Sequence, residues 1–168
     1  MDKLTKEQRH KCMAAIKSKN TKPEIIVRKF LFSRGFRYRL NHPRLPGHPD
    51  IVMRKYKTVI FVNGCFWHGH DCRFASTPKS NTVFWTNKIK RNITRDKQTI
   101  EKLALMGWNA ITVWECQLKP SLRINTLNAL ELTLNQIFIM NHKKSYYLEQ
   151  DEVHRAAENT VDYNCHNS

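Results

Sequence analysis

The sequence lacks the features of a membrane-spanning or secreted protein. No apolar run approaches the ~18 residues that a membrane span needs. Residues 1–6, Met-Asp-Lys-Leu-Thr-Lys, have no signal-peptide-like apolar stretch. Internal repeats and low-complexity tracts are absent as well. Five cysteines are an odd number in a chain without an export signal, which favours free thiols or metal binding over a disulfide framework. We therefore expect a protein of the cytoplasm.

Acidic residues are scarce. The chain has 14 Asp and Glu against 29 Lys and Arg, which gives a net charge of +15 and a pI near 9.9. Residues 1–140 hold 26 basic and nine acidic residues and carry +17, whereas residues 141–168 hold three and five and carry −2. Nucleic acid is the commonest partner of so basic a body, and solubility alone is the alternative explanation.

Length and composition predict one domain. A chain of 168 residues with 40% hydrophobic residues can bury a core without disulfides, and is too apolar to be disordered. We assign residues 1–140 to this domain. Residues 141–168 lack a strong apolar period, which predicts a C-terminal tail that is partly disordered.

The order of the expected elements indicates the fold class. Helices are expected over residues 5–19, from a capping-box pattern at 21–24 to Gly35, over 82–106 and over 122–140. Strands are expected over 36–40, 50–53, 58–62 and 110–114. Strands that alternate with helices predict an α/β domain built on a small mixed sheet.

Soft metal ligands gather in one irregular segment. Cys65, His70 and Cys72 fall within eight residues, and Cys116 follows the last expected strand. Thiolate and imidazole are the ligands that Zn²⁺ prefers, and a loop without a core of its own gains stability from such a clamp. His68 is a competing ligand, and unrelated free thiols are the alternative. The pattern predicts a structural zinc site.

Three acids have unusual positions. Asp50 opens a strand after a Pro-Gly turn, and Asp96 lies on the apolar stripe of its expected helix. Glu24 either closes the capping box with Thr21 or points inward. A buried ion pair would equally explain Asp96, because an unpaired buried charge is costly. If the three carboxylates converge at one edge of the sheet, they form a site suited to Mg²⁺.

Two adjacent aromatic residues, Phe66 and Trp67, lie inside the cysteine-rich segment. In a basic protein such a pair can stack on bases or wedge between them. It can also simply fill the gap between loop and sheet. The spacing does not separate these two roles.

Together these segments resemble a known family. They are Leu-Pro-Gly-His-Pro-Asp at 45–50, Val-Ile-Phe-Val-Asn-Gly-Cys-Phe-Trp-His-Gly-His-Asp-Cys at 59–72, and Gly-Trp-Asn-Ala-Ile-Thr-Val-Trp-Glu-Cys at 107–116. The sequence is similar to the very short patch repair (Vsr) mismatch endonucleases from about residue 6 to 140. The resemblance implies a restriction-endonuclease-like fold of the PD-(D/E)xK type. It also implies Mg²⁺-dependent nicking of duplex DNA on the 5′ side of the thymine in a T·G mismatch, which arises when 5-methylcytosine deaminates.

The resemblance also assigns roles. Asp50 and the main-chain carbonyl of Val62 would bind magnesium, and His68 would be the general base that activates water. Glu24 and Asp96 would hold hydrated metal and neighbouring groups. The remaining assignments are a DNA-contacting basic segment at residues 1–20, base-stack insertion by Met13, Phe66 and Trp67, and zinc ligation by Cys65, His70, Cys72 and Cys116.

The chain departs from the family pattern at two positions. Val62 replaces a hydroxyl residue, which does not matter where only a main-chain carbonyl is used. Asn63 replaces a histidine, and can hydrogen-bond a phosphate or a metal-bound water but cannot exchange protons.

Partners and alternatives follow from the same resemblance. The expected partner is double-stranded DNA with a T·G mismatch, other mismatch-repair proteins are further candidates, and the protein is expected to be a monomer at the bacterial nucleoid when it acts. One alternative is a related endonuclease with another DNA target. The other is a zinc-stabilised DNA-binding module without catalysis, against which Asp50, His68, Asp96 and Glu24 together argue.

Overall fold

A computed structural model describes the backbone of residues 5, 7–8, 11, 14–15, 19–76, 78 and 80–164, and side chains of these residues as far as 143. The basic helix expected over residues 5–19 lies largely outside the described residues, and Met13 lies outside them. No helix in this described part is long and apolar enough to cross a membrane.

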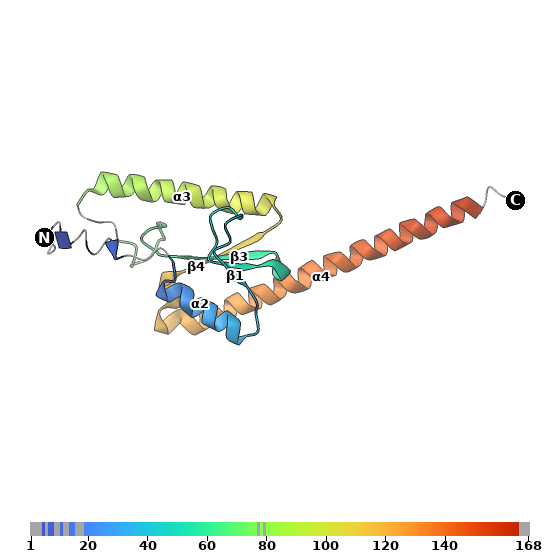
Figure 1. Cartoon of the computed structure of the whole chain (residues 1–168), viewed down its shortest axis with the longest axis horizontal. Coiled ribbons are helices and arrows are strands. Elements are labelled where there is room, and N and C mark those ends of the chain that lie inside the picture. The colour runs from blue at the N-terminus through green and yellow to red at the C-terminus, as the bar shows by residue number, and fades with distance from the viewer. Residues whose placement is uncertain are drawn as a thin grey trace.

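Four strands form one mixed sheet in the order β1-β2-β3-β4 (Figure 1). Their bounds are Arg39–Leu40, Ile51–Met53, Thr58–Asn63 and Asn109–Trp114. β1, β2 and β3 pair antiparallel, and β4 runs parallel to β3. A parallel pair needs a crossover connection, and α3 (Thr82–Leu105) lies within it. The predicted small mixed sheet is confirmed.

The strand expected over residues 36–40 is mostly wrong, because only its last two residues pair in β1. Phe36 is instead a buried core residue whose ring lies 5.5 Å from that of Tyr56. Tyr56 ends the short 3-10 helix η1 (Arg54–Tyr56), which joins β2 to β3. Apolar packing therefore takes Phe36 out of the sheet.

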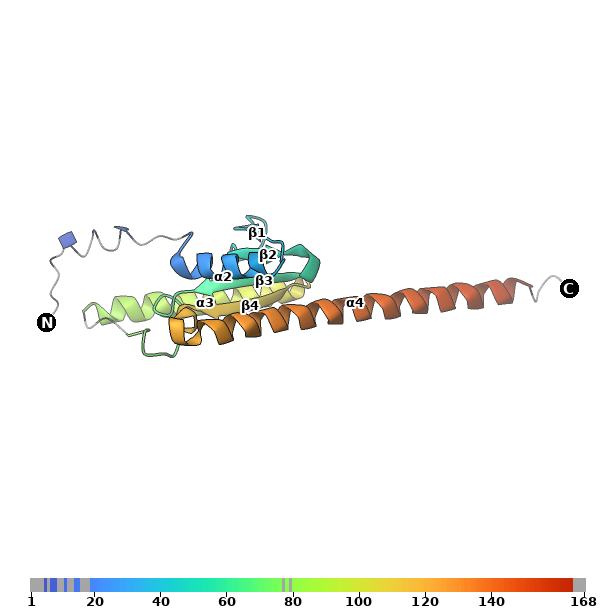
Figure 2. The same ribbon diagram turned by 90° about the horizontal axis from the view of Figure 1, so that it is seen from below.

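Helices cover both faces of the sheet (Figures 1 and 2). α2 (Lys22–Ser33) and the first half of α4 (Pro120–Asn164) pack on one face, where the larger core cluster includes Leu31, Ile51, Ile60 and Leu134. α3 covers the other face, with Leu103 against Val52 and Val59. Alternate residues of β2 and β3 face opposite layers, as the period of an extended strand requires.

α2 begins and ends where the sequence predicts. The Thr21 hydroxyl accepts the Glu24 N–H, and Glu24 accepts the Thr21 N–H, which completes a capping box with Pro23 in the first turn. After α2 ends, Gly35 adopts a φ of +83°, a left-handed conformation that glycine takes without strain.

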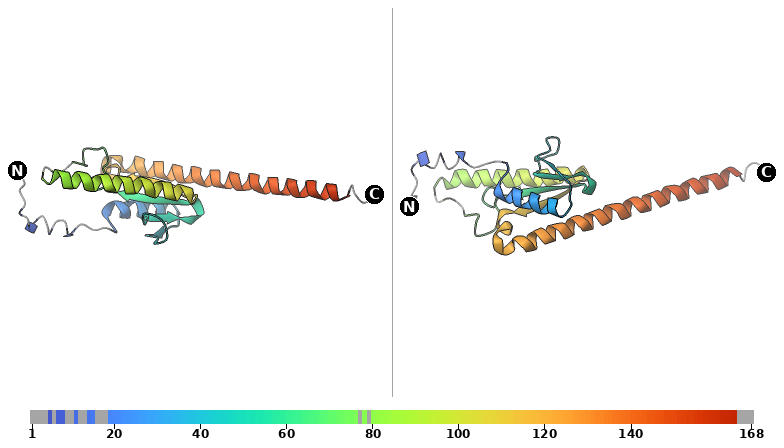
Figure 3. Two further views of the ribbon diagram at one scale, coloured as in Figure 1. Left: turned by 90° about the horizontal axis from the view of Figure 1, so that it is seen from above. Right: turned by 60° about the horizontal axis from the view of Figure 1, so that its bottom comes forward.

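α4 is longer than expected. It begins at Pro120 and runs to Asn164, so that it continues past the sheet and projects from the body (Figures 1 and 3). The short 3-10 helix η2 (Glu115–Leu118) leads into it from β4. The backbone of the predicted tail is therefore helical to Asn164, and its assignment as a separate, partly disordered tail remains a prediction.

Candidate active site and metal centre

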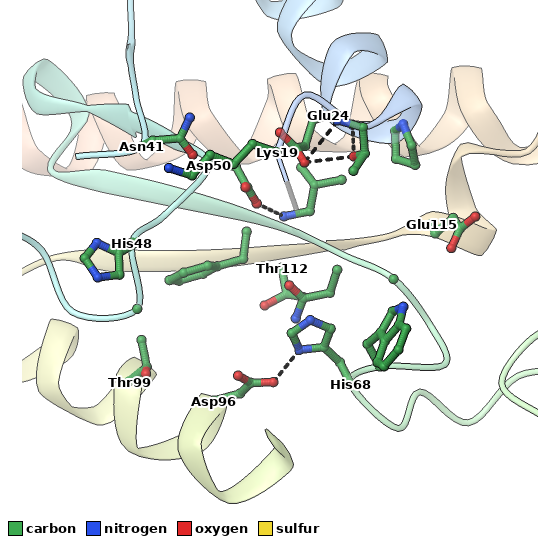
Figure 4. A pocket seen from close by; sticks show the side chains of 18 of the residues that line it. Lys19, Glu24, Asn41, His48, Asp50, His68, Asp96, Thr99, Thr112 and Glu115 are labelled. Atoms are coloured by element: carbon green, nitrogen blue, oxygen red, sulfur yellow. Dashed lines mark hydrogen bonds and ion pairs between the residues drawn. The ribbon is translucent and has the colours of Figure 1, made fainter. Parts of the chain in front are cut away.

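A cleft of about 930 Å³ lies beside the sheet, between the start of α2, the end of β3 and the middle of α3. Its walls carry four carboxylates and two cations, seen in part in Figure 4. The carboxylates are Glu24, Asp50, Asp96 and Glu115, and the cations are Lys19 and Arg95. Four chain segments that are remote in sequence therefore contribute charge to one concavity.

Asp50 directly precedes β2 and points across it to β3. Its Oδ2 accepts a hydrogen bond from the Val62 N–H at 2.8 Å. Burial raises the pKa of Asp50 above its ordinary value; the Val62 hydrogen bond opposes this rise, Glu24 adds to it, and Arg28 and His68 oppose it. The side chain is thus fixed in position, but its charge is only partly compensated by the protein.

The turn before Asp50 packs closely on α3. Gly47 has a φ of +74°, and a Cβ atom there would lie 2.4 Å from the Thr99 side chain and 3.3 Å from the ring of Phe61. Only glycine fits this approach without displacing its neighbours. The Pro-Gly turn therefore anchors Asp50 at the wall of the cleft.

His68 and Asp96 form a pair across the cleft. The distance from His68 Nδ1 to Asp96 Oδ2 is 2.5 Å, and Asp96 also accepts a hydrogen bond from Arg95 at 3.2 Å. An ionised carboxylate can only accept, so in neutral His68 this contact places the proton on Nδ1 and leaves Nε2 as a base. Asp96 thus has two partners: His68 on the loop after β3, and Arg95, which is the kind of partner that a simple ion pair would supply.

Glu24 is buried, with 3% of its surface exposed. Its two carboxylate oxygens accept from the N–H groups of Asn20 and Thr21, the Thr21 hydroxyl and the Arg28 guanidinium. A carboxylate offers about four acceptor positions, so these protein donors fill them. Both sequence interpretations hold, because Glu24 closes the capping box and also lines the cleft.

α3 holds the loop that carries His68. The Asn92 amide donates to the Trp67 carbonyl at 2.8 Å. Gly69 has a φ of +61°, and an added Cβ atom would lie 2.6 Å from Ile93 and 2.9 Å from Ile89. The loop backbone therefore sits directly on the apolar stripe of the helix.

Four aromatic side chains meet beside this loop. The Phe66 and Trp67 rings lie 5.0 Å apart, and each contacts Trp85, at 5.3 Å and 5.9 Å. Phe84 adds a fourth ring, 5.2 Å from Trp85. The Lys88 ammonium lies between 5.4 and 5.7 Å from three of these rings. We call Phe66, Trp67, Phe84 and Trp85 the aromatic cluster.

The four predicted soft ligands converge on the far side of the loop. One donor atom from each of them lies within 4.8 Å of the others, and the ligands are Cys65, His70, Cys72 and Cys116. Ligand atoms bound at about 2.0–2.3 Å in a tetrahedral site lie about 3–4 Å apart, so this set fits one metal ion. His70 stacks on Trp114 at 4.1 Å, which fixes its ring. His68 is not in the set, since it faces the cleft (Figure 4).

Burial, together with hydrogen bonds from the neighbouring thiols of Cys116 and Cys72, raises the pKa of the Cys65 thiol to about 12. Without a cation, the thiolate of Cys65 is therefore disfavoured. A bound metal ion would replace the thiol proton, because thiolate is the ligating form.

The structure therefore brings most predicted site residues to two places. Asp50, Val62, Asn63, His68, Asp96 and Glu24 line the cleft with Trp67. The sequence interpretation missed Lys19, Arg95 and Glu115 in the walls, Arg28 beneath Glu24, and the contacts of Trp85. Glu115 stood in the quoted Trp-Glu-Cys segment, but nothing in the spacing showed that it faces the cleft.

The fold and the cleft define a class of protein. A carboxylate before one strand of a small mixed sheet, a His–Asp pair opposite it and a strongly basic body are the features of a restriction-endonuclease-like hydrolase.

Comparisons with known proteins identify the family. A sequence profile described as "DNA mismatch endonuclease Vsr" matches residues 1–74. The type II nicking enzyme V.NmeAIP of Neisseria meningitidis is 53% identical over 118 residues, 70% of this chain and 84% of the relative. V.XorIIP of Xanthomonas oryzae is 45% identical over 136 residues, covering 81% and 96%. The DNA mismatch endonuclease Vsr of Escherichia coli is 40% identical over 114 residues, covering 68% and 73%. The chain belongs to the Vsr DNA mismatch endonuclease family.

Proposed function

We propose that this endonuclease nicks duplex DNA on the 5′ side of the thymine in a T·G mismatch, with Mg²⁺ as its catalytic metal. The observation that carries this proposal is the meeting of Asp50 with the His68–Asp96 pair in one cleft beside the aromatic cluster. A hydrolytic centre and a stacking surface are then close enough to act on neighbouring nucleotides.

Asp50 and Val62 would hold the magnesium. Carboxylate and carbonyl oxygens are hard ligands that suit this ion. Within a strand, the N–H and C=O of one residue point to the same edge, so the Val62 carbonyl faces the edge where its N–H meets Asp50. A bound magnesium ion would neutralise charge on the phosphodiester and lower the pKa of the attacking water.

His68 would take the proton from that water. Its Nδ1 hydrogen bond to Asp96 holds the ring orientation and leaves Nε2 to accept. Asp96 would also stabilise the imidazolium that forms. Asn63 ends β3 in the wall of the cleft, where its amide would hydrogen-bond a phosphate or a metal-bound water.

Phe66 and Trp67 would enter the base stack beside the mismatch, with Trp85 extending the same surface. A wobble pair stacks less well than a Watson–Crick pair, so it is cheaper to wedge open. Phe84 and Trp85 of the aromatic cluster belong to α3, and Asn92 of the same helix holds the Trp67 carbonyl, so α3 would keep the wedge rigid. Met13 and residues 1–20 would contact the DNA from the N-terminal segment.

The second metal site would hold a structural zinc ion. Four soft ligands complete a tetrahedral shell and leave no position for a reacting water. The loop that this site closes carries both the proposed wedge and the proposed base, so the zinc would fix their positions without joining the chemistry.

One experiment separates the alternatives. End-labelled duplexes that differ only in T·G against C·G at one pair are incubated with enzyme, with Mg²⁺ or with EDTA. We expect a nick 5′ of the mismatched thymine, only in the T·G duplex and only with Mg²⁺. Nicking of the C·G duplex would indicate an endonuclease with another target, and tight binding without nicking would indicate a non-catalytic DNA-binding module.

A further inference from the structure

Arg28 is a buried arginine beneath the cleft that none of the roles above uses. It is 8% exposed and lies one turn after Glu24 in α2. Its two terminal nitrogens point to different partners: one donates to Glu24 at 2.6 Å, and the other to the side-chain carbonyl of Asn20 at 2.6 Å. A rigid guanidinium fork that is used in two directions fixes the distance between those partners.

The Glu24 contact compensates a buried charge. The side chains of Arg28 and Glu24 are 10% and 4% exposed, so water screens their charges little. The neighbouring carboxylate of Asp50 adds negative charge, which Arg28 partly offsets. Glu24 is thus held in one orientation at the wall of the cleft.

The contact with Asn20 links Arg28 to the turn that precedes α2. Asn20 precedes the helix cap and has a φ of +56°, the left-handed conformation in which the chain turns sharply. Lys19, the residue before it, lines the cleft. Arg28 therefore holds the turn next to Lys19 from inside the body.

Helix capping does not account for this arrangement. The reciprocal bonds between Thr21 and Glu24 complete the capping box without Arg28. Arg34, at the other end of α2, shows what an ordinary ion pair looks like in this helix: its side chain is 49% exposed and lies 3.3 Å from Glu131. Arg28 is instead buried between the cleft and the turn at Asn20.

We infer that Arg28 is a positioning residue: by binding Glu24 and Asn20 together, it fixes the turn at Asn20, and with it Lys19, at the wall of the cleft. The inference rests on the proposed function in one respect, namely that Lys19 contacts the DNA. Loss of the Asn20–Arg28 contact should then weaken DNA binding and raise KM more than it lowers the rate at saturating DNA.

The test compares four variants of the full-length protein. Asn20→Gly removes the acceptor and keeps the left-handed turn, Arg28→Lys keeps the charge beside Glu24 but cannot bridge both partners, and Arg28→Met removes the charge. Arg34→Met is the matched control on the same helix. Affinity for a T·G duplex is measured in EDTA, KM and the single-turnover rate in Mg²⁺, and Tm for each protein.

We expect Arg28→Met to weaken DNA binding on the order of tenfold or more, as expected for loss of a charged hydrogen bond. Asn20→Gly should weaken binding in the same sense, with a change of Tm no larger than that of Arg34→Met, and Arg28→Lys should fall between. Adding Asn20→Gly to Arg28→Met should change little, because Arg28→Met already removes the contact that Asn20→Gly removes.

Other outcomes overturn the inference. Folded Asn20→Gly and Arg28→Lys proteins with the affinity and KM of the wild type would show that Arg28 serves stability alone, even if Arg28→Met fails to fold. Additive effects in the double variant would also contradict it. A wild-type protein that binds the duplex without nicking it would refute the proposed activity and leave this comparison intact, whereas one that binds no duplex would refute both.

Discussion

Two opposing effects act on the ionisation of Asp50. It must be ionised to hold a magnesium ion, yet burial raises its pKa. The Val62 N–H fixes its position without neutralising its charge. The protein alone does not fully compensate the negative charge of ionised Asp50. A bound magnesium ion would compensate it, so the site should favour metal binding.

Asp50→Ala should therefore abolish nicking, with a loss of several orders of magnitude. His68→Ala should cost less, on the order of 10²–10⁴-fold, as expected for a general base. Single-turnover nicking of a T·G duplex with saturating enzyme measures both, and Glu101→Ala, which changes an exposed acid on α3 outside the cleft, is the control. DNA affinity should be unchanged or slightly tighter in Asp50→Ala, because a negative charge near phosphate is lost. Near wild-type nicking by Asp50→Ala would refute the metal assignment.

The raised pKa of Asp50 also predicts an effect on stability. An acid whose pKa is higher in the folded state destabilises that state once it ionises, so its cost is present above the folded pKa and absent below the unfolded one. In EDTA, Asp50→Asn should raise Tm at pH 7, and the gain should shrink as the pH falls through the acidic range. Thermal melts across pH measure this. A gain that grew toward low pH would contradict the direction of the shift.

At the scale of elements, much of the fold could be predicted because its signals are local. The capping box at Thr21 and the glycine after α2 mark that helix, and β3 and β4 are apolar runs at their expected places. The end of α4 was missed because no glycine or proline follows Pro120, so no local signal stops the helix at 140.

The site was harder to predict, because contacts between remote segments decide it. The partner of Asp96 is a loop residue 28 positions earlier, and the spacing of the apolar stripe shows only that the acid faces inward. The third ring beside Phe66 and Trp67 belongs to Trp85 of α3, and no local pattern in the sequence joins that helix to the loop. The four soft ligands were predictable, since three lie within eight residues.

The proposed zinc site would hold the loop between β3 and α3 in place. Cys116→Ser should lower the bound zinc, measured by elemental analysis, and lower the Tm, because serine is a poor zinc ligand and the loop loses its clamp. Cys165→Ser, outside the four ligands, is the matched control. Purified wild-type protein that held no zinc and yet folded normally would show that the cluster is a set of free thiols.

A substitution in the aromatic cluster can distinguish base stacking from a purely structural packing role. Trp67→Ala should reduce T·G discrimination more than stability, since base stacking is worth ~1–3 kcal/mol, or roughly ten- to hundredfold in binding. Phe74→Ala is the control, because Phe74 is an exposed aromatic in the same loop, 44% accessible, and is flanked by cations rather than by the cluster. Binding to T·G and C·G duplexes and Tm are compared. A Trp67→Ala protein that melts far lower but keeps its preference would mean that Trp67 is core.

At the scale of the whole molecule, charge is separated along the long axis. Residues 1–140 carry +17, whereas residues 141–168 carry −2, and the far part of α4 projects from the body (Figure 1). The acidic residues of that part therefore do not offset the positive charge of residues 1–140. DNA that approaches the body meets a field that attracts phosphate irrespective of sequence.

This charge predicts how binding responds to salt. Each phosphate contact made by a lysine or arginine releases condensed counterions, so about six contacts would cost ~10³-fold in affinity between 50 and 200 mM salt. Residues 1–140, with a net charge of +17, have enough cations for six phosphate contacts, so we expect a loss of affinity of about 10³-fold.

Phosphate contacts carry no base information, whereas the aromatic cluster would act on the mismatch itself. The slope of log affinity against log salt should therefore be the same for T·G and C·G duplexes, and only the offset between the two lines should reflect the mismatch. Fluorescence anisotropy across a salt series measures both quantities. A slope near zero would refute phosphate contact as the main source of affinity, and a slope that differed between the duplexes would show that the mismatch changes how many cations engage.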